Sequence, residues 1–534
     1  MMADYDYVIV GAGSAGCVLA YRLSEDPNIR VLLLEAGGKD SHPFIHMPRG
    51  LARVMSNLRY IWPYMTKAEP GSNNVAESWA RGRTLGGSSA VNGMVYVRGA
   101  APDFDALAEL SSDDWNWAHI GEAYRAMEAH ELGAAATRGD RGPLRITLPE
   151  DRPALAEKVI AAGEAMGLVR MDDINDPADR ERVGYAPRTI FKGKRQSAAV
   201  AFLRPAMKRP NLTVHTGVLI DRILFDGTRA TGVTGTRDGK PVTYAADETL
   251  VAAGALASPA LLQRSGVGPA DTLRALDIPI VADNPAIGAN LFEHRGIVFQ
   301  WRVPDRLSMN RLFRGARLVA SVLRYRFQGK GVMAGGAYDM AAYAKSDPSL
   351  DRPDLQILMA PFTFDFTALP IRVEKHGGLN FCIYAIRPAA RGHLRITTRD
   401  PSTLPDIVPN YGSHDDDRAM IGKMIAYARR YVGQAPLEPL IEEETRPGAR
   451  YASDEQIASA YLEYGYANYH AAGTCRMGKD AASAVDPELS VRGVQHVRVV
   501  DTSVFPFMLA GNTQAPAMAI AWRAADLLRR NTKS

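Results

Sequence analysis

The apolar positions at the start of the chain fall into two short runs with a helix between them. Tyr5–Val10 (YDYVIV) contains several β-branched residues and is typical of a buried parallel strand. The pattern then continues as a helix from Cys17 to Leu23, and Val31–Leu34 is a second apolar run that ends at Glu35. This order predicts a βαβ unit, the element from which doubly wound α/β domains are built.

Glycines occupy the turn between the first strand and the helix, in the order Gly11-Ala-Gly13-Ser-Ala-Gly16. In such a unit Gly11 makes the tight turn, Gly13 lets the backbone approach a pyrophosphate, and Gly16 lets helix and strand pack closely. The helix N-terminus supplies N–H groups to the phosphates, and Glu35 stands where an acid binds ribose hydroxyls. The pattern predicts a dinucleotide site and leaves FAD and NAD both open. A glycine-rich turn without a ligand is the alternative.

A second glycine cluster, residues 81–93, has the sequence RGRTLGGSSAVNG. It is dense in backbone N–H donors and short polar side chains, and it contains Arg83 and Asn92. Such a loop can pass close to a second face of a large cofactor, which favours FAD. An ordinary surface turn is the alternative, although a turn alone would hardly need so many small residues.

Two candidate acid–base residues come late in the chain. His470 precedes a small-residue turn, and Asn512 stands in the turn Gly511-Asn512-Thr513. A histidine has an unperturbed pKa near 6.5 and can take up a proton, and an asparagine can hydrogen-bond the same oxygen. Both residues also suit ordinary turns. Beside a cofactor fold they indicate a redox enzyme whose acid–base groups return to the cofactor.

Length and composition narrow the class of protein. The chain has 534 residues, of which 46% are hydrophobic and 23% charged, so we expect a globular protein with two domains or one elaborated domain. The net charge of +4 is spread along the chain and gives no reason to expect a nucleic-acid partner. The three cysteines are scattered and predict no disulfide framework. No motif predicts a metal site.

Other titratable residues are interpreted as structural. Cys475 is read as a small packed residue, with a reactive thiol as the minor alternative. His215, His294 and His393 have no comparable partner in the sequence.

The N-terminus lacks a secretion signal, and no apolar stretch reaches the roughly 20 residues that span a bilayer, so we expect a cytoplasmic protein. Residues 311–330 form a basic amphipathic segment with no acidic residue. The favoured interpretation is a helix that packs one face on the protein. The alternative is peripheral contact with the inner face of a membrane.

Together these motifs resemble the glucose–methanol–choline (GMC) flavoprotein oxidoreductases, and within that family the choline-dehydrogenase-like alcohol dehydrogenases. The matching segments span nearly the whole chain in family order. They are residues 11–16, 35–37, 83–89, 92–99, 253–259, 287–291, 470–478, 499–503 and 511–513.

The resemblance implies an α/β fold: a doubly wound, Rossmann-like FAD-binding domain interleaved with a substrate domain built on a mainly antiparallel sheet flanked by helices. We expect residues 1–300 to form the FAD-binding region, with inserted pieces of the substrate domain. Residues 301–465 would form the substrate-binding domain, and residues 466–534 would return to the FAD domain. The apolar run from Asp354 to Phe362 and the strand pattern Leu394–Thr398 fall in the substrate domain.

The resemblance also assigns the cofactor site. The implied FAD-binding residues are Gly11, Gly13, Ser14, Gly16, Glu35, Ala36, Arg83, Gly87, Asn92, Gly93, Met94, Val95, Val218, Ala253, Gly254, Asp501, Asn512 and Thr513. Some members attach the flavin through a histidine just before the asparagine of the second glycine loop. Val91 occupies that position here and cannot form the bond, so we expect non-covalent FAD.

The implied activity is oxidation of a primary alcohol to an aldehyde, with a dehydrogenase favoured over an oxidase. His470 would act as the base, Asn512 as its hydrogen-bond partner, and flavin N5 would accept the hydride. An FAD-containing, hydroxynitrile lyase-like enzyme and a flavin-binding protein without turnover are the alternatives. The alcohol (aliphatic, polyether, aryl or choline-like), the acceptor (quinone or oxygen) and the oligomeric state stay open.

Overall fold

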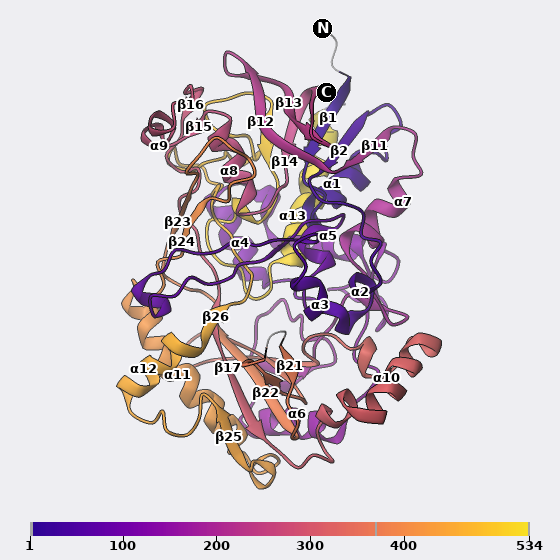
Figure 1. Cartoon of the computed structure of the whole chain (residues 1–534), viewed down its shortest axis with the longest axis vertical. Coiled ribbons are helices and arrows are strands. Elements are labelled where there is room, and N and C mark those ends of the chain that lie inside the picture. Colours follow the sequence, from indigo (N-terminus) through magenta and orange to yellow (C-terminus); the bar gives the residue numbers. More distant parts are fainter. Residues whose placement is uncertain (1–3, 369–370, 532–534) are drawn as a thin grey trace.

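The computed structural model describes residues 4–368 and 371–531. Two large sheets, one in each half of the molecule, organise this part of the chain (Figure 1). The upper half in Figure 1 contains the N-terminal strands and the C-terminal helix, and the lower half contains most of the middle of the chain.

The first sheet is built on the predicted βαβ unit. β1 (Tyr5–Val10) pairs in parallel with β2 (Val31–Glu35) and with β14 (Lys240–Val251), and helix α1 (Ser14–Leu23) connects the first two strands. The order is β11-β2-β1-β14-β13-β12, with β27 beside β14. The additional strands are β11 (Leu212–Thr216), β12 (Val218–Asp226), β13 (Arg229–Arg237) and β27 (Val497–Val499). The first strands are parallel, as their continuous apolar runs predicted, whereas β12 and β13 form an antiparallel extension.

The C-terminal helix α13 (Gln514–Asn531) returns to this half and packs beside α1. Its residues 518–521 are buried in the same apolar core as β1 and β2. The chain therefore ends on the domain in which it begins, and the turn before α13 is carried to the cofactor side.

The second sheet is antiparallel except for its β7–β8 edge. Its order is β25-β17-β22-β19-β18-β8-β7, with β26 also beside β17. The strands are β7 (Val169–Arg170), β8 (Arg182–Tyr185), β17 (Arg295–Arg302), β18 (Met340–Ala344), β19 (Leu355–Ala360), β22 (Gly378–Ala385), β25 (Glu443–Arg446) and β26 (Gly465–Ala467).

The two faces of this sheet have different neighbours. Phe381 and Ile383 of β22 join the core formed with helices α6 (Ala154–Ala165) and α11 (Asp415–Val432). Cys382 and Tyr384 alternate with them and point to the opposite face, as the two-residue repeat of a strand requires. That opposite face looks toward the first half of the molecule.

Short elements complete the described chain. The helices are α2 (Pro43–His46), α3 (Leu51–Met55), α4 (Ala101–Leu110), α5 (Trp117–Met127), α7 (Arg204–Ala206), α8 (Ala257–Arg264), α9 (Ala270–Ala275), α10 (Gly315–Gln328) and α12 (Asp454–Tyr464). The paired strands are β3 (Ile61–Trp62) with β4 (Arg81–Gly82), β5 (Glu128–His130) with β6 (Leu144–Ile146), β9 (Ile190–Phe191) with β10 (Lys194–Arg195), β15 (Val267–Gly268) with β16 (Ala282–Asp283), β20 (Phe364–Asp365) with β21 (Arg372–Val373), and β23 (His393–Arg395) with β24 (Asp406–Val408).

The predicted fold class is confirmed: a doubly wound half is interleaved with a mainly antiparallel half. Strands β7 and β8 come from residues 169–185 and join a sheet whose other strands lie between 295 and 467. The expected boundaries at 300 and 465 both fall within strands, β17 and β26, and the division into domains stays a prediction.

Helix α10 occupies most of the basic segment and stands out from the antiparallel half (Figure 1). It has no buried residue: Leu318 and Tyr325 are half-buried, while Val319, Leu323 and Phe327 are 60%, 50% and 78% exposed. Over the described residues, no helix combines the length and apolar character needed to cross a membrane.

Candidate active site

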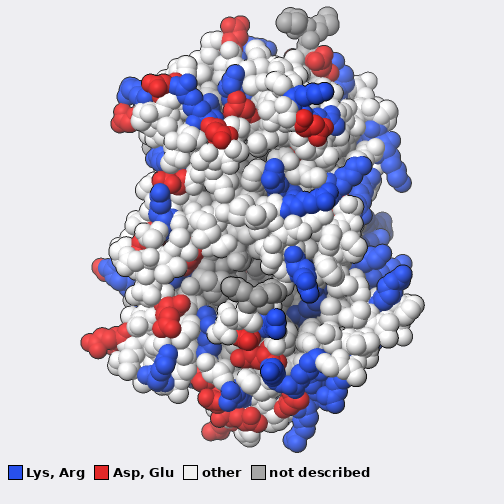
Figure 2. Space-filling view, in the orientation of Figure 1, with Lys and Arg blue, Asp and Glu red and all other residues white. Residues whose placement is uncertain are grey.

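A cavity of about 820 Å³ lies between the two halves and is lined by residues of both. Figure 2 shows the molecule hollowed between its upper and lower parts. The volume is in the upper part of the range of about 300–1,000 Å³ that small-molecule and cofactor sites occupy. Most of the residues assigned to the cofactor by resemblance line this one cavity.

The first glycine loop forms one end of the cavity. Gly11 has φ +105°, and a Cβ there would lie 2.6 Å from the Ala252 carbonyl oxygen. Gly16 does not line the cavity; a Cβ there would lie 1.9 Å from the Gly11 carbonyl oxygen. Gly16 thus has the close helix–strand packing that the sequence predicted for it, while a Cβ at Gly13 would meet only the Ala252 carbonyl oxygen, at 3.9 Å.

Glu35 is fixed beside this loop by backbone donors. Its Oε2 accepts from Ala12 N at 3.0 Å and its Oε1 from Gly37 N at 2.8 Å. Burial raises the pKa of this carboxyl to about 7, against the lowering effect of the two N–H groups. Glu35 lines the cavity at the end of β2, where the sequence pattern expects an acid for ribose.

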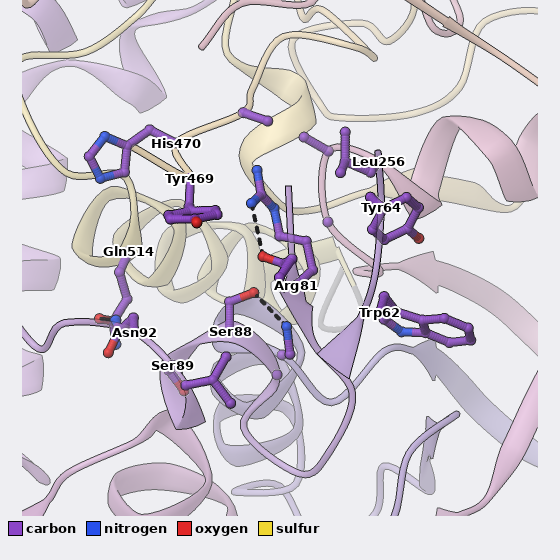
Figure 3. A pocket seen from close by; sticks show the side chains of 18 of the residues that line it. Trp62, Tyr64, Arg81, Ser88, Ser89, Asn92, Leu256, Tyr469, His470 and Gln514 are labelled. Carbon is purple, nitrogen blue, oxygen red and sulfur yellow. Dashed lines mark hydrogen bonds between the residues drawn. The ribbon is translucent and has the colours of Figure 1, made fainter. Parts of the chain in front are cut away.

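The second glycine loop packs against the first, and both line the cavity. Gly87 has φ +51°, and a Cβ there would lie 2.7 Å from Gly13 Cα, so side chains larger than hydrogen would separate the loops. Asn92 donates a hydrogen bond to Gln514, and the two lie together near His470 in Figure 3. Arg195 donates to the Asn92 side chain at 2.7 Å. Gln514 and Arg195 were not assigned to the site from the sequence: Gln514 follows the Gly511-Asn512-Thr513 turn without an assigned role, and Arg195 belongs to no motif.

Arg83 does not line the cavity, although the resemblance assigned it to the flavin half. Its guanidinium stacks on Trp62 at 4.2 Å. Trp62 and Tyr64 line the cavity on the side of Arg81 away from His470 (Figure 3). Arg83 therefore supports the wall through Trp62.

The remaining assigned residues include Asp501, which supports the turn after β14 at the cavity wall. Asp501 Oδ2 accepts from Gly254 N at 2.8 Å and from Ser258 Oγ at 2.5 Å, so it holds the turn that follows β14. The other assigned residues that line the cavity are Ser14, Ala36, Gly93, Met94, Val95, Val218, Ala253, Asn512 and Thr513. Val91 also lines it, buried among apolar side chains.

His470 and Asn512, 42 positions apart in the chain, meet in this cavity, with His470 Nε2 2.9 Å from Asn512 Nδ2. On its other side, His470 Nδ1 lies 2.9 Å from Nδ1 of His294. His294 Nε2 lies 2.7 Å from the carbonyl oxygen of Ile386, and Gln356 Nε2 donates to Asn512 Oδ1 at 3.1 Å. The interpretation of His294 as a residue without a comparable partner is wrong: it is the direct neighbour of His470.

The Ile386 carbonyl gives this chain of hydrogen bonds a direction. A carbonyl only accepts, so His294 carries its proton on Nε2 and its Nδ1 is an acceptor. His470 then donates from Nδ1, and its Nε2 is left as an acceptor for Asn512 Nδ2. Asn512 Oδ1 correspondingly accepts from Gln356. The network selects the tautomer of His470 whose free lone pair faces the cavity.

Burial keeps both imidazoles neutral. It lowers the pKa of His294 to about 4, and it lowers the pKa of His470 well below its usual value, with His294 and Arg81 adding to the effect. A neutral His294 cannot donate from both nitrogens, which supports the assigned direction. His470 is 8% exposed and can accept a proton within the cavity.

Glu293 is a further residue of the site that sequence reasoning missed. Its side chain is fully buried; Oε1 accepts from His470 N at 2.5 Å, and Oε2 lies 3.5 Å from Arg81 Nη2. Burial raises the pKa of this carboxyl to about 7. Glu293 fixes the backbone at His470, and its position directly before His294 was the only available signal.

The wall from the antiparallel half is aromatic. The lining residues there include Tyr338, Leu358, Phe364, Phe366, Ile371, Arg446, Tyr464, Tyr466 and Asn468.

Cys475 is fully buried in the core of the other half, and burial raises the pKa of its thiol well above the usual value. No group of His, Cys, Asp and Glu side chains in residues 4–368 and 371–531 is arranged to hold a metal ion.

Comparison with known families agrees with this geometry. The N-terminal domain of the GMC oxidoreductases matches residues 5–295, and the C-terminal domain of the GMC oxidoreductases matches residues 388–521. The "Oxygen-dependent choline dehydrogenase" of Yersinia pseudotuberculosis serotype IB (strain PB1/+) is 37% identical, over 98% of this chain and 94% of that protein. The mitochondrial choline dehydrogenase of Homo sapiens is 36% identical, over 98% of this chain and 90% of that protein.

Solved structures show the same architecture. Pyridoxine 4-oxidase from Mesorbium loti has a TM-score of 0.88 and 31% identity, with 99% of each chain covered. Formate oxidase of Aspergillus oryzae RIB40, studied for FAD modification, has a TM-score of 0.92 and 26% identity, with 100% of each chain covered.

The chain belongs to the GMC oxidoreductase family. It is an FAD-dependent enzyme that oxidises the CH–OH group of an alcohol, and its sequence is similar to those of the choline dehydrogenases. The relatives named above support oxidation and give no support to the lyase alternative.

Proposed function

We propose that His470 takes the hydroxyl proton of the alcohol and that Asn512 hydrogen-bonds the same oxygen. The observation that carries this proposal is the directed chain of hydrogen bonds that leaves Nε2 of His470 as an acceptor facing the cavity. A neutral, buried imidazole with one free lone pair is suited to general-base catalysis.

The two glycine loops fit a dinucleotide, because glycines at the cavity wall leave space that side chains would otherwise fill. A Cβ at Gly13 would have one neighbour within 4 Å, the Ala252 carbonyl oxygen at 3.9 Å, and a Cβ at Gly254 would have none, so both glycines leave room at the wall for an extended ligand. The residues proposed to hold FAD are Gly11, Gly13, Ser14, Glu35, Ala36, Gly87, Asn92, Gly93, Met94, Val95, Val218, Ala253, Gly254, Asp501, Asn512 and Thr513. Gly16 and Arg83 support this set by packing.

The alcohol oxygen would replace the direct 2.9 Å hydrogen bond between His470 Nε2 and Asn512 Nδ2, and these two side chains would move apart to admit it. Asn512 would donate to the oxygen, and the hydroxyl would donate to His470. As the proton moves to Nε2, negative charge grows on an oxygen that already accepts from the Asn512 amide. Gln356 holds that amide from the other side, so the N–H stays directed at the substrate.

Proton transfer leaves His470 positively charged in a buried place. Its Nδ1–H continues to donate to the neutral His294, and the Glu293 carboxyl lies next to its backbone. When bound, the flavin supplies the acceptor for the hydride that leaves the alcohol carbon. The protein contributes position, a base and exclusion of water.

The base is tested by His470→Ala in the flavin-loaded enzyme. We expect turnover to fall by roughly 10²–10⁴-fold while FAD is retained. An unchanged rate would remove His470 as the base. Anaerobic mixing with alcohols tests the activity itself: bleaching of the oxidised flavin supports alcohol oxidation, whereas an unreduced flavin would favour a lyase or a flavin-binding protein without turnover.

Val91 supports non-covalent FAD, because its side chain lines the cavity and offers no nucleophile. Acid precipitation should release the flavin into the supernatant. Flavin that stays on the denatured protein would contradict the assignment.

The proposed membrane contact and electron acceptor depend on the exposed surface of helix α10. The exposed apolar side chains of α10 and its arginines fit an anionic membrane surface, where a quinone would be available. Figure 2 shows basic side chains gathered at the lower right, near α10. Flotation with anionic liposomes at low salt tests this contact, and dye reduction measured beside oxygen uptake tests the acceptor. Protein that stays below the liposomes would exclude the membrane interpretation.

The names of the relatives leave the alcohol open. They include choline dehydrogenases, a pyridoxine 4-oxidase and a formate oxidase, whose substrates differ in charge and shape. The substrate therefore has to be inferred from the side chains that line the cavity of this chain.

A further inference from the structure

Arg446 is a cation on the cavity wall without an acidic partner. It ends strand β25, and its guanidinium makes one described hydrogen bond, from Nη2 to the Tyr464 carbonyl at 3.5 Å. Nε is buried without a partner, and no carboxylate oxygen of the described residues lies within 4.0 Å of its nitrogens. A guanidinium has five N–H donors that suit a carboxylate or phosphate. An unsatisfied guanidinium at a ligand cavity points to an anionic group on the ligand.

Two aromatic rings hold this guanidinium in place. Its central carbon lies 4.5 Å from the ring centre of Phe366 and 4.5 Å from that of Tyr464. Such ring faces are also what a quaternary ammonium would use. Here they are occupied by a fixed positive charge, which would repel a second cation. This end of the cavity is therefore unsuited to a choline-like substrate.

The acids on the cavity wall do not reverse this conclusion. Glu35 and Asp501 are each bound by backbone N–H groups on the cofactor side. Glu463 is exposed at the rim and accepts from the Tyr451 hydroxyl at 2.9 Å. Glu463 lies near enough to favour the charged form of Arg446 but forms no ion pair with it. Each acid of the described wall thus already accepts a hydrogen bond from the protein, and the charge of Arg446 lies near Glu463.

The position of Arg446 sets the approximate length of the ligand. Tyr464 ends α12, Tyr466 lies in β26, and Asn468 and His470 follow that strand; all four line the cavity. Six residues of extended chain span at most about 20 Å. Arg446 stacks on the first of these side chains, and the proposed base is the last.

The wall between these ends is largely apolar. Leu358, Phe364 and Ile371 line it, and the hydroxyls of Tyr338 and Tyr466 lie 3.4 Å apart and pair with each other. A ligand that fits has a hydroxyl at one end, an apolar body, and a negative charge at the other end.

We propose that the enzyme oxidises amphipathic alcohols with an anionic end, of the ω-hydroxy carboxylate class, whose carboxylate binds Arg446 while the hydroxyl reaches His470. The proposal rests on the proposed role of the His470 cavity as the site of alcohol oxidation. It goes further by assigning the charge of the substrate and the residue that selects it.

The test compares substrates that differ only in their far end. ω-Hydroxy carboxylates of six to sixteen carbons are compared with the corresponding primary amides and trimethylammonium compounds, in the flavin-loaded enzyme. We expect kcat/KM to be highest for the carboxylates, with a maximum at one chain length. Arg446→Met should lower kcat/KM for the best carboxylate by roughly 10- to 100-fold and change that of the amide little. Equal values for carboxylate and amide, or a preference for the cation, would overturn the proposal.

Arg450→Met is the matched control, because Arg450 lies four residues away, is exposed, and does not line the cavity. It should retain the preference for the carboxylate; an equal loss in both variants would show that only the overall charge matters. Arg446→Lys keeps the charge without the fork and covers the case in which the methionine variant does not fold; it should lower the preference, and an unaltered preference would count against the assignment.

Binding separates this proposal from the proposed function. Octanoate, octanamide and octyltrimethylammonium lack a hydroxyl, and calorimetry gives their affinities without turnover. Tightest binding of octanoate, lost in the Arg446 variants, would support the anion site even if no alcohol were oxidised. Tighter binding of the ammonium compound would refute it even if alcohols were oxidised.

Discussion

Replacing His294 tests whether its hydrogen bond selects the working tautomer of His470. Leu and Asn have nearly the same size and shape, but only Asn carries an acceptor that can face Nδ1 of His470. Both variants leave the Ile386 carbonyl without its donor, so that cost is common to them. The comparison isolates the acceptor opposite His470.

The expected magnitude follows from the burial of the pair. In His294→Leu the Nδ1–H of His470 is buried without an acceptor, which costs about 1–3 kcal/mol. The other tautomer, with its proton on Nε2, avoids this cost but cannot take a proton from the alcohol. We therefore expect the rate of the chemical step to fall by roughly 10- to 100-fold in His294→Leu. His294→Asn should retain most of the rate.

The assay is anaerobic stopped-flow reduction of the bound flavin by a saturating alcohol, with FAD content measured from the absorbance of each variant. Nitrogen NMR of labelled histidine would report the tautomer directly, with Nε2 unprotonated in the wild type and in His294→Asn. Equal rates in the two variants, with equal FAD content, would refute the assigned direction of the chain. A loss of FAD in both would show that His294 is a structural residue.

Three further predictions concern pH and packing. Burial lowers the pKa of His294 to about 4, whereas its unfolded pKa is near 6.5, so the folded state loses stability as the pH falls from 6.5 toward 4. The free energy of unfolding of the wild type should fall by roughly 3 kcal/mol over that window, which thermal melting would report, and His294→Asn should show a smaller fall. The lowered pKa of His470 keeps it neutral in mildly acidic solution, so kcat/KM should decrease only well below pH 6.5, where the imidazole becomes protonated. A decrease in kcat/KM centred at pH 6.5 that is absent in His470→Ala would contradict the burial argument. Gly16→Ala should lose FAD binding and stability because its Cβ would lie 1.9 Å from the Gly11 carbonyl, whereas Gly38→Ala, with no atom within 4 Å, should retain both; equal behaviour on thermal melting would refute the packing role.

Local patterns were sufficient to predict the cofactor half. The apolar runs, the glycine spacing and Glu35 lie within one stretch of about 30 residues, and each has a short-range physical reason to be where it is. β1 and β2 have the predicted bounds, and α1 begins three residues earlier than predicted, at Ser14 instead of Cys17. The second glycine loop lines the same cavity as the first, although Arg83 within it packs on Trp62 instead of facing the cavity.

The substrate half could not be predicted in the same way, because its decisive contacts join residues that are distant in the chain. His294 and His470 are separated by 176 positions, and no local pattern distinguishes His294 from His215 or His393. Pairing of β17 with β26 brings Arg295 opposite Ala467 and so brings the residues just beyond both strands together. The partner of the proposed base is therefore determined by the register of a sheet.

The same dependence applies to Arg446. In the sequence it is one basic residue among many, followed by proline and glycine. It becomes distinctive because β25 pairs with β17 on one side while Tyr464 and Phe366 enclose its guanidinium, and no acid completes the cluster. A charged side chain can be recognised as unpaired only when the structure shows all of its neighbours. The fold and cofactor of such an enzyme thus follow from local motifs, whereas the charge of its substrate depends on which long-range neighbour is missing.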